Sequence, residues 1–351
     1  MRIGVVTTSY PRFDGDAAGS FVAAHVAYLR GRGHDVDVVA AGAPVPFADG
    51  LFYEGGAPDA IEAGASLTAM ARFTIDQTRA VMRRARGWDA TVAHWWVPSG
   101  LAAAIARAPK PIVIAHGGDI HVARRAKMIV PVALALVARR ARFVFVSRAL
   151  RAAAIDAMPR ALAARIDRAS IVQPMGIDVA HFASLKRAPI AGRIAVFARL
   201  VPIKGVAIAI EAMRHVRGEL IIAGDGPLRA SLERDAPPNV RFAGALDARA
   251  RDELLRTAAI VVVPSIEIDG RTEGTPMIAM EALAAGVPVV ASATGGLVDL
   301  PGVTRVPPGD PRTLAAAIDR ELVRPSTSLG ANGRAFDWAT VGAAIDAHWM
   351  R

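Results

Sequence analysis

The stretch IVVVPSIEIDGRTEGTPMIAMEALAAGVPVVAS, residues 260–292, runs from β-branched residues through a polar loop and a helix-compatible segment to a second apolar run. Short apolar runs separated by a helix are typical of buried parallel strands in a βαβ unit. Residues 260–292 therefore predict a strand, a crossover helix and a parallel strand. The same alternation extends over the rest of the chain.

Ten apolar runs, five in each half of the chain, have this character. They are RIGVVTT, DVDVVAA, DATVAH, PIVIAHG and FVFVS, then RIAVFA, GELIIAG, NVRFAG, IVVVPS and VPVVAS. Two such series predict an α/β protein with two Rossmann-like, doubly wound parallel sheets, and 351 residues suffice for two cores. We place the domains at residues 1–183 and 184–335, with a break near SLKRAPIAG, and a C-terminal helix at 336–351.

The composition limits the chemistry. The chain has no cysteine, which excludes disulfides, thiolate metal sites and cysteine nucleophiles. The N-terminal MRIGVVTTSYPRF lacks the apolar region of a signal peptide and is expected to form the first strand, so we expect a cytoplasmic protein. The run MIVPVALALVA, residues 128–138, is shorter than the roughly 20 residues of a membrane span. It predicts either a core helix or a helix lying on a membrane.

The net charge of +10 is concentrated in the first half. Residues 1–175 carry 22 Lys and Arg against 13 Asp and Glu, whereas residues 176–351 carry 20 against 19. One interpretation is an anionic partner of the first half, such as anionic lipid or a phosphate-bearing substrate. The other is compositional arginine enrichment, since 38 of the 42 basic residues are Arg. Few aromatic residues and no groove-reading motif argue against nucleic acid.

Ligands of open parallel sheets bind beyond the carboxyl ends of the strands, so the residues after each run are the candidates. In FARLVPIKG, Arg199 and Lys204 follow a strand and together could clamp a diphosphate. In AGDGPLR, Gly224 and Gly226 permit a tight turn, which either presents amides to an anion or is purely structural. Gly19, at the start of the first helix, has the same two interpretations.

His94 and His116 also end strands. No further ligand stands at a helical metal-binding spacing, so a metal site is disfavoured, and His116 is better interpreted as a neutral hydrogen-bonding group near a ligand. Two Asp-x-Asp triplets occur, but Asp14–Asp16 precedes the first helix and Asp35–Asp37 lies inside a strand.

Glu273 and Glu281 are eight residues apart, about 80° beyond two helical turns, so they do not share a helix face. Glu273 is expected to project from the loop, and Glu281 to lie further along the helix. Between them, amides are exposed at the helix start. The residues at this start are Gly274, Thr275, Pro276 and Met277.

Taken in order, these segments resemble the GT-B-type retaining glycosyltransferases of family 4 over essentially the whole chain. EGTPMIAME resembles the E-x7-E motif and FARLVPIKG the donor-phosphate clamp. AHGGD, VSRALR, QPMGID, AGDGPLR and VPPGDPRTLAAAI are also similar to family segments. The sequence departs from the family at Met175, where many relatives have asparagine, and at Thr275, where many have a larger apolar residue.

The resemblance implies a GT-B fold whose C-terminal helix returns to the first domain, and a nucleotide-sugar donor held mainly by the second. Arg199 and Lys204 would bind the diphosphate, Glu281 the ribose hydroxyls, and Glu273 the transferred sugar. His116 would lie near that sugar from the first domain.

Gly19 would lie near the phosphates and acceptor, and Gly224 and Gly226 at the donor site. The cations and helix N-termini would stabilise the leaving group, so neither a metal nor another cofactor is expected.

The hypothesis is a retaining hexosyltransferase of glycolipid or cell-envelope and exopolysaccharide synthesis, with a lipid-linked or saccharide acceptor. Attachment to the inner face of the cytoplasmic membrane depends on the anionic-partner interpretation of the charge. Two alternatives remain open: a GT-B relative that epimerises or hydrolyses nucleotide sugars, and a two-lobed sugar-binding protein without chemistry.

Overall fold

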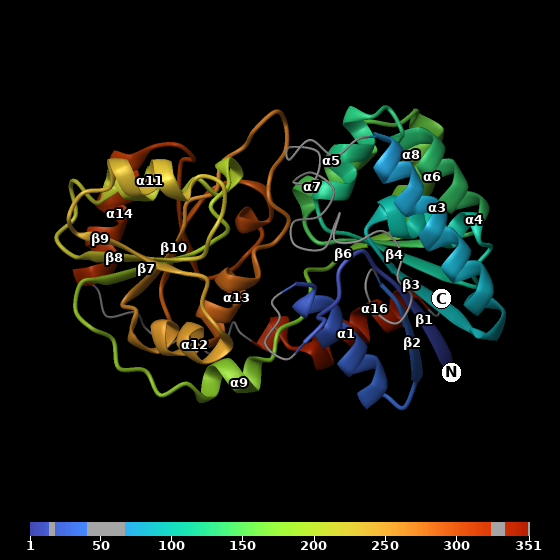
Figure 1. The fold of residues 1–351 in the computed structure, drawn as a ribbon, viewed down its shortest axis with the longest axis horizontal. Coiled ribbons are helices and arrows are strands. Elements are labelled where there is room, and N and C mark those ends of the chain that lie inside the picture. Colours follow the sequence, from blue (N-terminus) through green and yellow to red (C-terminus); the bar gives the residue numbers. More distant parts are fainter. Residues whose placement is uncertain (14–17, 41–66, 324–333, 350–351) are drawn as a thin grey trace. The chain divides into compact units, whose positions relative to one another are not determined.

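The computed structural model describes residues 1–13, 18–40, 67–323 and 334–349. The chain forms two compact units (Figure 1). The first unit comprises Met1–Gly176 with Val341–Arg351, and the second comprises Ile177–Thr340.

The first unit contains a six-stranded sheet in the order β2-β1-β3-β4-β5-β6, and every strand pair in it is parallel. Its strands are β1 (Arg2–Val6), β2 (Asp35–Val39), β3 (Ala90–His94), β4 (Pro111–Ala115), β5 (Arg142–Phe145) and β6 (Ser170–Val172). Its helices are α1 (Ser20–Gly31), α3 (Leu67–Arg84), α4 (Leu101–Ile105), α5 (Gly118–Arg125), α6 (Ile129–Ala138), α7 (Arg148–Ile155) and α8 (Arg160–Arg168).

The second unit contains a six-stranded parallel sheet in the order β12-β11-β10-β7-β8-β9. Its strands are β7 (Arg193–Phe197), β8 (Glu219–Ala223), β9 (Val240–Gly244), β10 (Ile260–Val263), β11 (Val289–Ser292) and β12 (Val303–Val306). Its helices are α9 (Val179–Ser184), α10 (Val206–Ala212), α11 (Arg229–Asp235), α12 (Ala248–Thr257), α13 (Met277–Ala284) and α14 (Pro311–Val323).

The second sheet is buried on both faces, as its continuous apolar strands require. Alternate residues of one strand enter different cores: Ile260 and Val262 pack with α10 and α14, whereas Val261 and Val263 pack with α12 and α13. Two-sided burial leaves the ends of the strands as the places where polar side chains can gather.

All ten predicted strands are present, and two short edge strands were missed, β6 and β12. The second unit begins at Ile177 rather than at the predicted residue 184, because Ile177 and Phe182 are part of its core and α9 packs against α13.

The C-terminal helix α16 (Trp338–Trp349) belongs to the first unit from Val341 onward, five residues after the predicted boundary at 336. The Tyr28 hydroxyl donates to Asp346 over 2.8 Å, and the Trp349 indole donates to the Lys110 carbonyl over 2.8 Å. A Cβ on Gly342 would lie 2.2 Å from the Tyr28 ring, so glycine is needed at this contact. The helix thus returns to the first unit, as predicted.

The apolar run 128–138 forms α6, which buries Val132 and Leu136 between its neighbours and leaves Leu134 54% exposed. It is therefore a core helix with one exposed face. Within the described ranges, no helix is both long and apolar enough to cross a membrane.

Candidate functional site

The second unit brings together two residues that the sequence predicted for different parts of a donor. Lys204 ends a short helical turn after β7, and Glu273 lies in the loop between β10 and α13. The Lys204 ammonium donates to Oε1 of Glu273 and forms an ion pair with it. The hydroxyl of Ser265, which is 1% exposed, donates to Oε2. Both carboxylate oxygens of Glu273 are therefore held by the protein.

Ser265 was not among the predicted site residues. It directly follows Pro264 at the end of β10, and its signal in the sequence was only that position beyond a strand. Arg199 lies two residues beyond β7 and is half-buried. Its predicted role at the diphosphate stays a prediction.

The loop that carries Glu273 is shaped by two glycines that sequence reasoning also missed. A Cβ on Gly295 would lie 2.2 Å from the Glu273 carbonyl oxygen, and a Cβ on Gly296 would lie 1.9 Å from that of Gly274. The Gly296 amide donates to the Gly274 carbonyl over 2.7 Å. The backbone after β11 thus packs directly against the residues that precede α13. Met277 is the first residue of this helix and Pro276 is its N-cap.

The turn at Gly224 and Gly226 has a packing explanation. A Cβ on Gly224 would lie 1.9 Å from the Ala198 carbonyl oxygen, and one on Gly226 would lie 2.7 Å from backbone atoms of Leu200. The Gly224 amide donates to the Gly244 carbonyl, and the Gly226 amide to its neighbour's side chain. These amides are used within the protein, so the structural interpretation of this turn suffices, and donor binding there stays a prediction.

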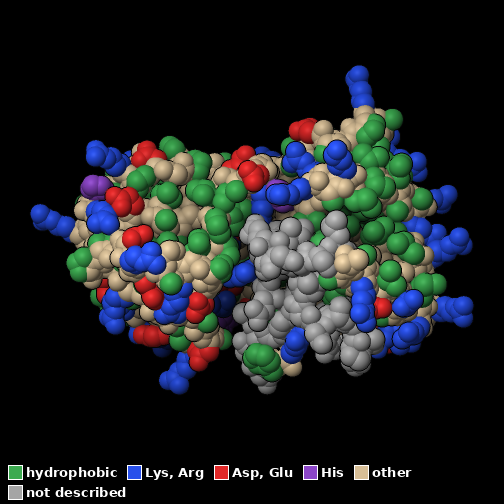
Figure 2. Space-filling view, turned by 45° about the horizontal axis from the view of Figure 1, so that its top comes forward, with side chains coloured by type: hydrophobic (Ala, Val, Ile, Leu, Met, Phe, Trp, Pro, Cys, Tyr) green, Lys and Arg blue, Asp and Glu red, His purple; other side chains and the backbone are tan. Residues whose placement is uncertain are grey.

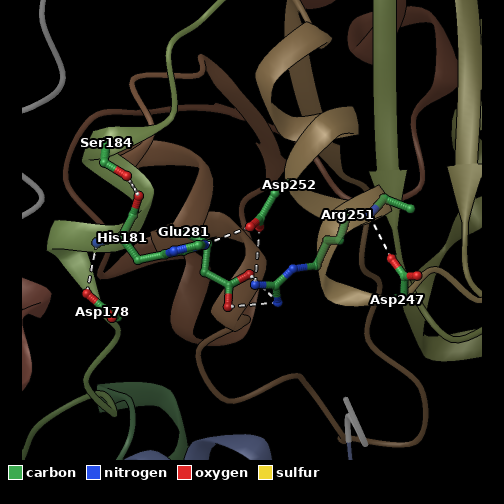
Figure 3. Close-up of polar contacts among 8 residues, drawn as sticks. Asp178, His181, Ser184, Asp247, Arg251, Asp252 and Glu281 are labelled. Atoms are coloured by element: carbon green, nitrogen blue, oxygen red, sulfur yellow. Dashed lines mark hydrogen bonds and ion pairs between the residues drawn. The ribbon is translucent and has the colours of Figure 1, made fainter. Parts of the chain in front are cut away.

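Glu281 lies in α13 and has partners different from those of Glu273 (Figure 3). Arg251 of α12 places Nη1 3.3 Å from each of its carboxylate oxygens, and the Arg251 guanidinium lies 5.3 Å from the centre of the Phe182 ring. The Asp252 carboxylate accepts a 2.7 Å hydrogen bond from the His181 imidazole of α9. Figure 3 shows that α9, α12 and α13 all contribute to this polar group.

Glu281 is only 8% exposed. Burial raises the pKa of this carboxyl above its usual value, and the positive charge of Arg251 opposes the increase. The carboxylate therefore depends on Arg251 as its counter-ion. Neither Arg251 nor His181 was predicted, because a contact between residues thirty positions apart on separate helices has no periodic signal.

In the first unit, His116 follows β4 and belongs to a row of three imidazoles. His94 Nδ1 lies 3.0 Å from His116 Nε2, and His94 Nε2 lies 3.1 Å from His25 Nδ1. His25 is in α1 and is buried, as is His94. His25 was missed because a lone histidine on a buried helix face looks like any other core residue.

The loop after His116 is held by Asp119, which is 1% exposed. Its carboxylate accepts from the backbone amides of Trp96, Gly117 and His116 over 2.7, 3.0 and 3.2 Å. Burial raises the pKa of the Asp119 carboxyl above its usual value, and these amide hydrogen bonds oppose part of the increase. The position of His116 is thus fixed through its backbone as well as its ring.

Partly exposed rings of Trp95 and Phe21 lie beside His116, with ring centroids 5.0 and 4.9 Å from it. Trp95 has φ 73°, a conformation that costs a non-glycine residue about 1–3 kcal/mol and that is common at functional sites. Gly19, the N-cap of α1, is also left-handed, and a Cβ there would lie 2.4 Å from the Ser9 carbonyl oxygen. Its role toward a ligand stays a prediction.

Among the described residues, no group of three or more His, Asp and Glu side chains could hold a metal ion. Asp14–Asp16 lies outside the described residues. Asp35–Asp37 lies in β2 as predicted, where Asp37 accepts from Arg84 and from the Trp88 indole. That triplet therefore has structural partners.

Residues 191–323 match the family model for glycosyl transferases group 1, which covers most of the second unit. The chain is 32% identical over 164 residues to WcaL of Salmonella typhimurium, named as a colanic acid biosynthesis glycosyltransferase, with 42% of this chain and 40% of WcaL covered. It is 28% identical over 320 residues to the D-inositol 3-phosphate glycosyltransferase of Xylanimonas cellulosilytica, with 78% and 74% covered. The chain spans 34–40% of the length of the first such relatives.

Among solved structures, HepE of Anabaena in complex with UDP-glucose is similar with a TM-score of 0.70 and 18% identity, over 99% of this chain and 98% of HepE. This likeness concerns the fold. With the two parallel sheets and the returning C-terminal helix, it confirms the predicted two-domain α/β GT-B fold.

Proposed function

We propose that this chain is a retaining glycosyltransferase that moves a sugar from a nucleoside-diphosphate sugar to a hydroxyl of a lipid-linked or saccharide acceptor, without a metal ion. The observation that carries the proposal is the separation of the two glutamates into two prepared sites of the second unit. Glu273 is held by Lys204 and Ser265, and Glu281 is held by Arg251. All of these residues lie within the segment that matches glycosyl transferases group 1.

In this function, Arg199 and Lys204 bind the donor diphosphate. The diphosphate carries more negative charge than one carboxylate, so it competes with Glu273 for Lys204. Release from Lys204 frees one oxygen of Glu273 to accept from sugar hydroxyls, while Ser265 keeps the other in place. Glu281 accepts from the ribose hydroxyls at the other end of the donor. UDP and UDP-glucose complexes of the structural neighbour HepE support a nucleotide-sugar donor.

In the chemical step, the acceptor oxygen bonds to the anomeric carbon as the bond from that carbon to the diphosphate oxygen breaks on the same face. The acceptor proton passes to the departing diphosphate. Negative charge grows on that leaving group, and the cations of Arg199 and Lys204 stabilise it. These cations take the role that Mg²⁺ has in other enzymes of this kind, so activity is expected to persist in chelator.

Thermal unfolding tests donor binding with UDP-, GDP- and ADP-sugars. A donor at a hundred times its Kd raises the free energy of unfolding by about 2.7 kcal/mol and so raises the midpoint. Glu281→Gln should weaken this shift, and Glu253→Gln, on the exposed surface of α12, should preserve it. If no member of the panel raises the midpoint of the folded protein, the proposal is wrong. Analysis of the products then separates transfer from epimerisation or hydrolysis.

We further propose that the first unit contacts an anionic membrane surface. Ile105 of α4 and Leu134 of α6 are each 54% exposed, and these two helices pack against each other. Arg107 and Arg140 follow the same helices, and Figure 2 shows Lys and Arg side chains projecting from the first unit. Apolar side chains flanked by arginines suit an interface with anionic lipid. Co-sedimentation with anionic but not neutral vesicles at low salt is expected, and equal binding to both would contradict it.

A further inference from the structure

We propose that His94 and His25 are positioning residues for His116, and that the three imidazoles form one hydrogen-bonded chain that fixes the orientation of the His116 ring and couples its tautomer to those of His94 and His25. The part of this inference that concerns a sugar ligand rests on the proposed function. The coupling of the three tautomers does not.

The geometry is that of a chain and not of a stack. His94 and His116 have nitrogens 3.0 Å apart, ring centroids 5.2 Å apart and planes only 16° from parallel. Rings with these values lie end to end, so the hydrogen bond is close to the plane of both. His25 meets the other side of His94 with its plane at 81° and a nitrogen distance of 3.1 Å. His94 therefore uses both ring nitrogens on imidazole partners.

The three rings are expected to be neutral. Burial lowers the pKa of His25 to about 4 and that of His116 to about 3, and it holds the pKa of His94 well below the usual range. The nearby Asp119 carboxylate does not offset this, because its oxygens accept from backbone amides of the loop. A neutral imidazole has one N–H and one lone pair.

Neutral rings allow only two arrangements of protons. If His25 donates from Nδ1, His94 must accept at Nε2 and donate from Nδ1, and His116 must accept at Nε2 and carry its own proton on Nδ1. If His116 donates from Nε2, the same reasoning places every proton on Nε2. In both arrangements, all three histidines have the same tautomer, and a mixed set would leave two lone pairs or two N–H groups facing each other.

The chain also determines what His116 offers to a ligand. Its Nε2 is occupied by His94, so Nδ1 is the ring nitrogen that can face a substrate. Whether Nδ1 donates or accepts is decided by the proton at the far end of the chain, on His25 in α1. Under the proposed function, a sugar hydroxyl is the ligand group expected at this nitrogen, beside the Trp95 and Phe21 rings.

Nitrogen-15 NMR of the full-length protein with labelled histidine tests the chain directly. At neutral pH, the signals of His25, His94 and His116, assigned by single substitution, should all report a neutral ring and the same tautomer. A mixed set of tautomers, or a charged ring at any of the three positions, would overturn the inference. This experiment needs no substrate, so its outcome is independent of the proposed function.

Substitution at the far end separates positioning from simple packing. His25→Leu leaves the His94–His116 contact in place but removes the group that orders the protons. The His116 signals should then shift toward an average of the two tautomers, and His215→Leu, at an exposed position in the second unit, should leave them unchanged. Unchanged His116 signals in folded His25→Leu protein would show that the chain does not couple the rings.

Kinetics extend the test to the ligand. His94→Leu should lower kcat/KM by about 2- to 10-fold, the scale of one misdirected hydrogen bond, and leave the affinity for the nucleoside diphosphate alone unchanged. His94→Gln, which can donate and accept, should restore part of the loss. The double variant with His116→Ala should lose no more than His116→Ala alone. Additive losses would contradict positioning through His116.

Discussion

Lys204 and Glu273 form an ion pair in the second unit, and Ser265 donates to the other oxygen of the same carboxylate. The pair is largely buried, with 27% of the lysine side chain and 10% of the glutamate side chain exposed. Lys204, which is predicted to bind phosphate, and Glu273, which is predicted to bind the sugar, are therefore paired with each other before any ligand binds. A donor that binds both side chains must replace this ion pair with its own contacts to each of them.

Lys204→Met tests the cation. Under the proposed function, it removes a charge that stabilises the leaving diphosphate and leaves Glu273 without its partner, so we expect kcat/KM to fall by about 100-fold or more. Lys186→Met makes the same change at an exposed lysine of the second unit and should have little effect. Equal kinetics for the two variants, measured by nucleoside diphosphate release, would remove Lys204 from the site.

Ser265→Ala tests the support of the sugar carboxylate. The change removes one hydrogen bond to a carboxylate at a buried position, so we expect the free energy of unfolding to fall by about 1.5–3 kcal/mol and KM for the donor to rise several-fold. Ser184→Ala, at an exposed serine of α9, is the control. A loss of stability with unaltered KM would make Ser265 a structural residue only.

Arg251→Met tests the counter-ion of Glu281. Burial raises the pKa of the Glu281 carboxyl, so the native state holds that proton more tightly than the unfolded chain, and the resulting stability is lost as pH rises from the unfolded to the native pKa. Arg251 opposes this increase. Without it, the pKa of Glu281 rises further and the loss of stability extends to higher pH.

The expected result is that the difference in free energy of unfolding between wild type and Arg251→Met grows as pH is raised above the usual range of a glutamate. Calorimetric unfolding over a pH series measures this difference. In a Glu281→Gln background, the pH dependence of the difference should vanish. If it persists there, another group is responsible.

Arg107→Gly and Arg140→Gly test the basic helix ends of the first unit. Both residues occupy left-handed positions, with φ 55° and 53°, two residues beyond the ends of α4 and α6. The following amides donate back to Ala103 and Leu136, the hydrogen bonds of a helix end that usually carries glycine. Each substitution should therefore raise the free energy of unfolding by about 0.5–1 kcal/mol.

Tryptophan fluorescence during chemical denaturation can follow this change, because Trp88, Trp95 and Trp96 all lie in the first unit. A variant that carries both Arg107→Gly and Arg140→Gly should bind anionic vesicles more weakly than the wild type, since two positive charges are removed. Greater stability with undiminished vesicle binding would contradict the proposed membrane contact.

Much of the fold follows from local sequence patterns. Apolar runs such as IVVVPS identified ten strands because buried parallel strands are continuously apolar. The edge strands β6 and β12 are only three and four residues long, and every residue of β6 is half-buried, so they lack that signal. The boundary at Ile177 was missed because it depends on which core Phe182 enters, which is a tertiary property.

The residues of the candidate site likewise fall into those that the sequence predicted and those that it did not. Lys204, Glu273 and His116 stand in the connections that follow strands, where ligands of parallel sheets bind, and Glu281 lies about one turn into the helix after such a connection. Their partners Arg251 and His25 lie inside helices instead. His25 lies 69 residues from His94, and Arg251 lies on a different helix from Glu281, so only the packing of the elements brings each pair together. Glycines such as Gly295 are required by close backbone contacts that no local pattern encodes.

The most direct test of the central claim is release of nucleoside diphosphate from a panel of UDP-, GDP- and ADP-sugars, in the presence of chelator and extracted bacterial lipid or saccharide acceptors. We predict acceptor-dependent release from at least one donor, with a product that retains the anomeric configuration, and its loss in Lys204→Met but not in Lys186→Met. No release from any donor by folded protein, or a product of inverted configuration, would contradict the account.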